Sequence, residues 1–200
     1  MTENADVLDL KDRLSLIESM IAEGRRTTES WGWTFVLWGV AYYVAIAWST
    51  LAQFGLAWPI TMVAACLLMG FVIRRKRGLR GGPLTTIGRS IRSIWISVGI
   101  SMFVLLDALG FSSRADWHTA TAVASTLIGT ANAASSLTLK WKLQFVCAMA
   151  WWAAAVVACF GSDRLCWISF LAAIFLCQIV FGVYGMISES RRHRQGAAHA

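Results

Sequence analysis

Four side chains in this sequence could do chemistry inside a membrane, because each is ionisable or carries an amide within or beside a long apolar run. They are Asp107, His118, Asn132 and Gln178. Such groups are expensive to place in hydrocarbon, so each is a candidate functional residue. The two ionisable ones flank one short connection and could approach each other. A carboxylate beside an imidazole raises the pKa of the histidine, which would make an outward-facing, proton-sensitive site. The simpler alternative is an interfacial Asp107 that accepts hydrogen bonds from Thr119 or Thr121.

The two amides, Asn132 and Gln178, lie toward the inner ends of their apolar runs. Neutral amides commonly bond between helices, at roughly 0.6–2 kcal/mol each. A structural role is therefore the first expectation, and the lining of a polar solute path is the alternative. Near Asn132, small residues recur every four positions and allow close helix packing, or could border an aqueous cavity. These residues are Thr121, Ser125, Gly129 and Ala133.

Two cysteines flank the connection FGSDRL between the last two apolar runs. A disulfide between Cys159 and Cys166 would staple those runs together if that side of the membrane is oxidising. Unpaired buried thiols are the commoner state of cysteine in apolar helices.

No catalytic, cofactor or metal site is predicted. The sequence lacks the H-E-x-x-H, G-x-S-x-G and Walker patterns, and it has no C-x-x-C pair. Its net charge of +7 is spread around the apolar runs without a nucleic-acid-binding motif, so nucleic acid is not an expected partner.

The elements that must position these residues follow from composition. Hydrophobic residues make up 57% of the 200 residues and charged residues 14%, and the mean hydropathy is +0.58. Soluble domains carry about 25% charged residues. The sequence therefore predicts an all-α, polytopic protein in a lipid bilayer. Six runs approach the roughly 20 residues that cross a bilayer, at 31–51, 56–73, 93–111, 117–137, 143–161 and 165–187.

Lysine and arginine predict the sidedness of these spans. Counting from the N-terminus, four, seven, two and three basic residues lie in alternate connecting segments, and the other segments hold only two. Positive residues stay in the cytoplasm, so both termini are expected inside, with three tight hairpins outside. The size and compact loops favour a bacterial inner membrane.

The segment ahead of the first span carries an apolar stripe with heptad-like spacing, formed by Val7, Leu10, Leu14, Ile17 and Ile21. Residues 4–24 are therefore expected to form an amphipathic cytosolic helix. It could bind a helix of a cytosolic protein or of a second copy, pack on the chain's own inner loops, or lie on the membrane. Residues 1–24 carry a net charge of −4, which disfavours an anionic membrane surface.

Three regions result: a cytosolic helix and linker (1–30), a six-helix membrane domain (31–187) and a disordered cytosolic tail (188–200). The acidic helix favours a non-enzymatic, membrane-anchored partner or regulatory protein. The polar fourth span keeps open a small-solute or ion transporter or channel. No residue pattern names the substrate or the partner.

Overall fold

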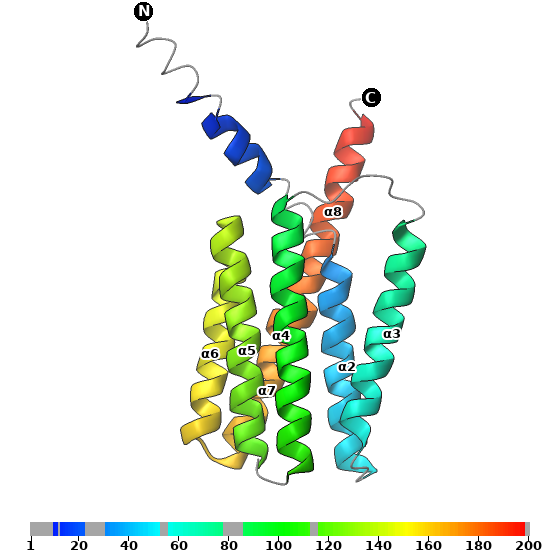
Figure 1. Cartoon of the computed structure of the whole chain (residues 1–200), viewed down its shortest axis with the longest axis vertical. Helices are drawn as coiled ribbons and strands as arrows, with labels where there is room; N and C mark the ends of the chain where they lie inside the picture. The colour runs from blue at the N-terminus through cyan, green and yellow to red at the C-terminus, as the bar shows by residue number, and fades with distance from the viewer. Residues whose placement is uncertain are drawn as a thin grey trace, which may run out of the picture.

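The computed structural model describes residues 10–11, 13–22, 31–52, 56–77, 86–112 and 116–198. Within these residues every regular element is a helix and no strand is present (Figure 1). Residues 13–22 are helical, and the later helices are α2 (Gly32–Leu51), α3 (Ala57–Arg77), α4 (Thr86–Phe111), α5 (Trp117–Leu139), α6 (Lys142–Phe160), α7 (Asp163–Ile174) and α8 (Phe181–Ala198). A π-helical segment, η1 (Phe175–Val180), joins α7 to α8 without a break.

The helices from α2 onward run side by side along the long axis of the molecule (Figure 1). Three junctions lie at one end of this bundle, between α2 and α3, α4 and α5, and α6 and α7. We call this end of the bundle the short-turn end. Ala52 after α2, Asp116 before α5 and Ser162 before α7 lie there. The helix of residues 13–22 and the last turns of α8 lie at the opposite end.

Five of the described helices are long and apolar enough to cross a membrane. They are Gly32–Leu51, Ala57–Arg75, Ile87–Gly110, Lys142–Phe160 and the continuous Asp163–Arg191. The chain is thus a helical bundle with several candidate membrane spans. α5 is not among the five, because its threonine, serine and asparagine residues lower its hydropathy. It nevertheless runs the length of the bundle beside α4 and α6 (Figure 1).

Helix contacts divide the bundle into a packed centre and two peripheral helices. α5 packs most closely on α6, α6 packs on α7, and α2 packs on η1 and α8. The main contact of α3 is with α2, and the main contact of α4 is with α5. In the most apolar 18-residue stretch of each helix, 17% of the α3 residues and none of the α4 residues are buried, so these two helices present most of their apolar surface outward.

Glycines set the closest approaches. A Cβ built on Gly32 of α2 would lie 2.5 Å from the Gly182 carbonyl oxygen of α8, and one on Gly182 would lie 2.7 Å from the Gly32 oxygen. On α5, a Cβ on Gly129 would lie 2.6 Å from the Trp152 ring of α6. These contacts require residues without a side chain.

An aromatic cluster joins four helices near the end opposite the short turns. Phe35 of α2 makes edge contacts with Trp95 of α4 and Phe181 of α8, each with ring centroids 5.3 Å apart. The ring centroid of Trp141, the residue before α6, lies 5.1 Å from that of Phe181. Edge contacts of this kind add about 0.5–1.5 kcal/mol beyond the buried area.

Three helix boundaries extend beyond the apolar runs predicted from sequence, and the first is the end of α3 at Arg77 rather than near 73. α8 continues to Ala198, where a disordered tail was expected from residue 188. α4 begins at Thr86 rather than near 93. Hydropathy marks the lipid-matched part of a helix, whereas polar residues with good helix propensity such as arginine, glutamate and glutamine extend it beyond that part.

Candidate functional site

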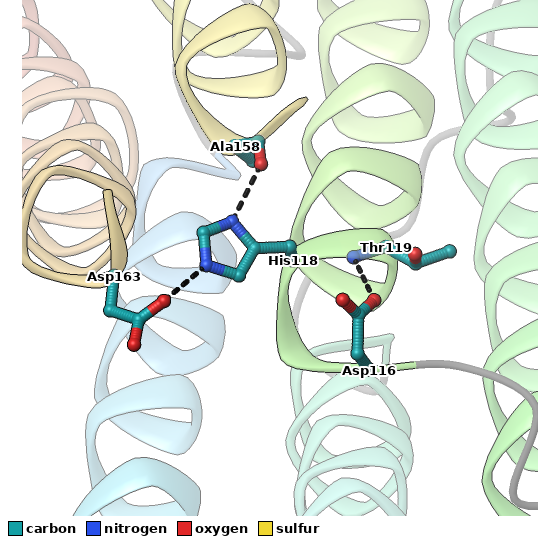
Figure 2. Close-up of polar contacts among 5 residues, drawn as sticks. All are labelled: Asp116, His118, Thr119, Ala158 and Asp163. Atoms are coloured by element: carbon teal, nitrogen blue, oxygen red, sulfur yellow. Dashed lines mark hydrogen bonds and ion pairs between the residues drawn. The ribbon is translucent and has the colours of Figure 1, made fainter. Parts of the chain in front are cut away.

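A group of polar side chains in contact with one another lies at the short-turn end, where α5 begins. Asp116 is the N-cap of α5, and its carboxylate accepts a hydrogen bond of 2.9 Å from the Thr119 backbone N–H (Figure 2). Hydrogen bonding by Thr119 holds the pKa of the Asp116 carboxyl below its ordinary value. A carboxylate at this position also suits the positive end of the helix dipole.

His118 lies in the first turn of α5 and touches two other helices. Its Nδ1 is 2.7 Å from the carbonyl oxygen of Ala158, in the last turn of α6. Its Nε2 is 2.7 Å from Oδ1 of Asp163, in the first turn of α7 (Figure 2). The last carbonyls of a helix have no partner within it, so the imidazole satisfies one of them. One side chain thus connects the ends of three helices.

The electrostatics of this contact favour a proton on the imidazole. Hydrogen bonding to Asp163 raises the pKa of His118 above its ordinary value of 6.5, and the bond to the Ala158 carbonyl acts in the same direction. None of the five candidate spans contains His118. The His118 side chain is 26% exposed and that of Asp163 is 91% exposed, so water screens the pair.

The sequence predicted that Asp107 could approach His118, but in the structure the carboxylate beside His118 is that of Asp163. Both imidazole nitrogens are occupied, by Ala158 and Asp163, which leaves none for Asp107. Asp107 lies half-buried in α4. The sequence signal for Asp163 was an acidic residue directly before an apolar run, which is typical of the first turn of a helix.

A second group of polar atoms lies inside the bundle, on the facing sides of α5 and α6. The side chains of Asn132, Ser135 and Gln144 have no exposed surface. The Asn132 Nδ2 donates to the Ile128 carbonyl of its own helix at 3.0 Å. Its Oδ1, both amide atoms of Gln144 and the hydroxyls of Ser125 and Ser135 have no hydrogen-bond partner in the structure described here. Each such group costs roughly 1–3 kcal/mol, so this face is energetically unusual.

Gln178 lies apart from that group. It is 3% exposed, in η1, and its Cβ would lie 3.0 Å from a Cβ on Gly39 of α2. Since Asn132 bonds within α5 and Gln178 packs against α2, the structure places the two predicted amides at separate helix contacts. Gln144, at the start of α6, was not among the predicted residues, although an amide in an apolar run is the signal that pointed to Gln178.

The structure has no disulfide between Cys159 and Cys166. Cys159 and Cys166 are both free thiols. Cys159 is exposed at the end of α6, whereas Cys166 is fully buried one turn into α7, so the two side chains face different surroundings.

The stripe on the N-terminal helix is solvent-facing where the structure describes it. Leu10, Leu14 and Ile17 are 59%, 52% and 51% exposed, and Ile21 is half-buried. Val7 lies outside the described residues.

No known protein family, curated protein or solved structure matches this chain with significant similarity. Among the residues that the structure describes, no group of three or more His, Cys, Asp or Glu side chains could hold a metal ion.

Proposed function

We propose that this chain is a non-enzymatic, membrane-anchored partner or regulatory protein that binds a cytosolic protein through its N-terminal helix. The observation that carries the proposal is the exposure of Leu10, Leu14 and Ile17 on a helix outside the bundle. Each large aliphatic side chain that becomes buried contributes about 1.5–3 kcal/mol, so covering three of them supplies substantial binding energy. The stripe also has the spacing by which helices recognise grooves and other helices.

The proposed occupant is a helix with an apolar stripe and basic flanks. Residues 1–24 carry a net charge of −4. A second copy would bring the same negative charge against it, and an anionic membrane surface would repel it as well. A lysine- and arginine-flanked helix matches both the stripe and its charge.

The membrane part of the proposal is six crossings, with both termini in the cytoplasm of a bacterial cell and the bundle in its inner membrane. α5 supplies the sixth crossing. It has 23 residues, about 34 Å at 1.5 Å per residue. Its residues 120–139 alone match a bilayer, which leaves Asp116, His118 and Thr119 at the water-facing end. The basic segments at 74–92 and 188–200 would then both be cytoplasmic, as expected for positive charge.

A binding measurement on the full-length protein in nanodiscs tests the docking proposal. The probes are two synthetic amphipathic peptides with the same heptad apolar stripe, one flanked by lysine and arginine and the other by glutamate. We expect the basic peptide to bind, the acidic one not to bind, and Leu14→Asp with Ile17→Asp to weaken binding at least about tenfold.

The control is Leu16→Asp. Leu16 is 61% exposed on the same helix but lies off the stripe, so this variant adds one of the two negative charges of the stripe variant without removing a stripe residue. Equal loss in the control and the stripe variant, or equal binding of both peptides, would reject the proposal. A dimer that becomes a monomer in the stripe variant would replace the cytosolic partner with a second copy.

The second candidate function is a small-solute or ion transporter or channel, and the buried polar face of α5 and α6 favours it. Unpaired amide and hydroxyl groups inside a membrane bundle commonly mark a substrate or water path. If the bundle conducts, vesicles containing the protein should pass urea, glycerol or potassium faster than empty vesicles, and Gln144→Met with Asn132→Leu should abolish the excess.

Thr130→Val is the matched control for the flux measurement. Thr130 is an exposed polar residue of α5 that bonds only to the Thr126 carbonyl of its own helix, at 2.9 Å. Flux equal to that of empty vesicles, or flux that survives the double variant, rejects the transporter candidate and leaves the docking proposal unaffected.

A further inference from the structure

The contacts of His118 require more protons than a neutral imidazole carries. Both ring nitrogens face acceptors only, the Ala158 carbonyl oxygen and a carboxylate oxygen of Asp163. A neutral imidazole has one N–H and one bare nitrogen, whereas the imidazolium has two N–H donors. Both 2.7 Å contacts are therefore hydrogen bonds only when the ring is protonated.

The charged groups around the ring favour that state. On α5 the nearest is Asp116, and on α7 they are Asp163 and its neighbour Arg164. The last turn of α6 has no charged residue, and its one titratable group is the thiol of Cys159. In the last three turns of α4, Asp107 is the one charged residue. Negative groups thus outnumber positive ones among the described residues at this end of the bundle.

We propose that His118 is a proton-binding site whose proton ties the start of α5 to the end of α6 and the start of α7. When the ring is protonated, one side chain bridges three helices. When it loses the proton, one of the two bonds is lost and the junction between α6 and α7 loosens from α5. The side of the membrane that supplies the proton is the outer one only if the proposed six-crossing topology holds.

The pH dependence follows from the direction of the pKa change. The pKa of His118 in the folded protein is raised above its ordinary value of 6.5. The contribution of this bridge to stability is fully present below that ordinary value and is lost as pH rises through the raised pKa. It is therefore largest in mildly acidic solution and absent in alkaline solution.

Three variants of the full-length protein in detergent test the inference. His118→Gln keeps one donor group and one acceptor group but cannot gain a proton, and Asp163→Asn removes the counter-charge. Asp107→Asn is the control, because it removes a carboxylate near the end of α4 that does not touch the ring. The measurements are the NMR titration of the His118 ring and the unfolding temperature between about pH 5.5 and pH 9, the range in which histidine changes charge.

We expect the His118 titration midpoint to lie above 6.5 and to fall by roughly half a pH unit or more in Asp163→Asn, but not in Asp107→Asn. The unfolding temperature of His118→Gln should lie below that of the unchanged protein in acid and equal it at alkaline pH. A gap that is independent of pH, or a midpoint that Asp163→Asn leaves in place, overturns the inference. Because these measurements are made in detergent, they do not depend on the proposed topology or on the docking of a partner.

Discussion

Gly182→Leu is expected to destabilise the folded bundle more than any other single change considered for this protein. A Cβ on Gly182 would lie 2.7 Å from the Gly32 carbonyl oxygen and 3.0 Å from the Val36 backbone nitrogen. These are backbone atoms of α2, which cannot move aside without separating the two helices. Overpacking usually costs about 1–3 kcal/mol, and a leucine at this position should reach or exceed the upper value. Thermal unfolding followed by tryptophan fluorescence should show a fall of roughly 6–12 °C.

Alanine substitutions at two packed glycines and at two glycines in open space provide the control. A Cβ on Gly99 of α4 or on Gly70 of α3 would meet nothing within 4 Å. Alanine favours a helix interior over glycine by about 1 kcal/mol, so Gly99→Ala and Gly70→Ala should leave the unfolding temperature unchanged or raise it. Gly32→Ala and Gly182→Ala should lower it. If all four variants respond alike, the close contact between α2 and α8 is not present in solution.

The sequence could not predict this contact, although it predicted the helices that form it. Apolar runs mark α2 and the last helix clearly, because a span needs about 20 apolar residues whatever it packs against. Gly32 and Gly182, by contrast, are far apart in the chain, and neither belongs to a Gly-x-x-x-Gly pair within its own helix. Which face of α2 meets which face of α8 depends on all the other helices, and nothing local encodes it.

His118 illustrates the same limit at the candidate site. Its residue type and position beside an apolar run identified it from sequence alone. The choice of Asp107 as its partner rested on closeness along the chain. The structure instead uses Asp163, at the start of another helix. Helix ends gather at the surface of a bundle, so the partner of a side chain at one helix end is often supplied by the end of a neighbour rather than by the preceding helix.

The unpaired amide of Gln144 shows a different limit. A sequence contains no information on whether a buried polar atom finds a partner, since that depends on side-chain positions in three dimensions. The sequence did predict that α5 would be small and polar on one face, and its four stripe residues are all buried. Packing of α5 against α6 buries the serine and asparagine side chains of this face, whereas the hydroxyls of the exposed Thr126, Thr130 and Thr138 bond to carbonyls of their own helix.

A reporter protein fused after Ala200 is expected to lie in the cytoplasm. The experiment distinguishes six crossings from five. If α5 crosses the membrane, a fluorescent protein fused after Ala200 fluoresces and a phosphatase fused there is inactive. If only the five most apolar helices cross, the chain end is exported and both readouts reverse. Export would also carry Arg191, Arg192 and Arg194 outside, against the preference of basic residues for the cytoplasm.

A second fusion after Lys140 isolates the role of α5. Lys140 lies in the turn between α5 and α6, in a left-handed conformation with φ 48°. Six crossings place this turn inside and five place it outside, whereas a fusion in the segment 78–85 is inside under both and serves as the control. An inactive phosphatase at both positions supports the sixth crossing. Activity after Lys140 alone would mean that α5 does not cross, and it would place His118 and Asp163 on opposite sides of the membrane, against their 2.7 Å contact.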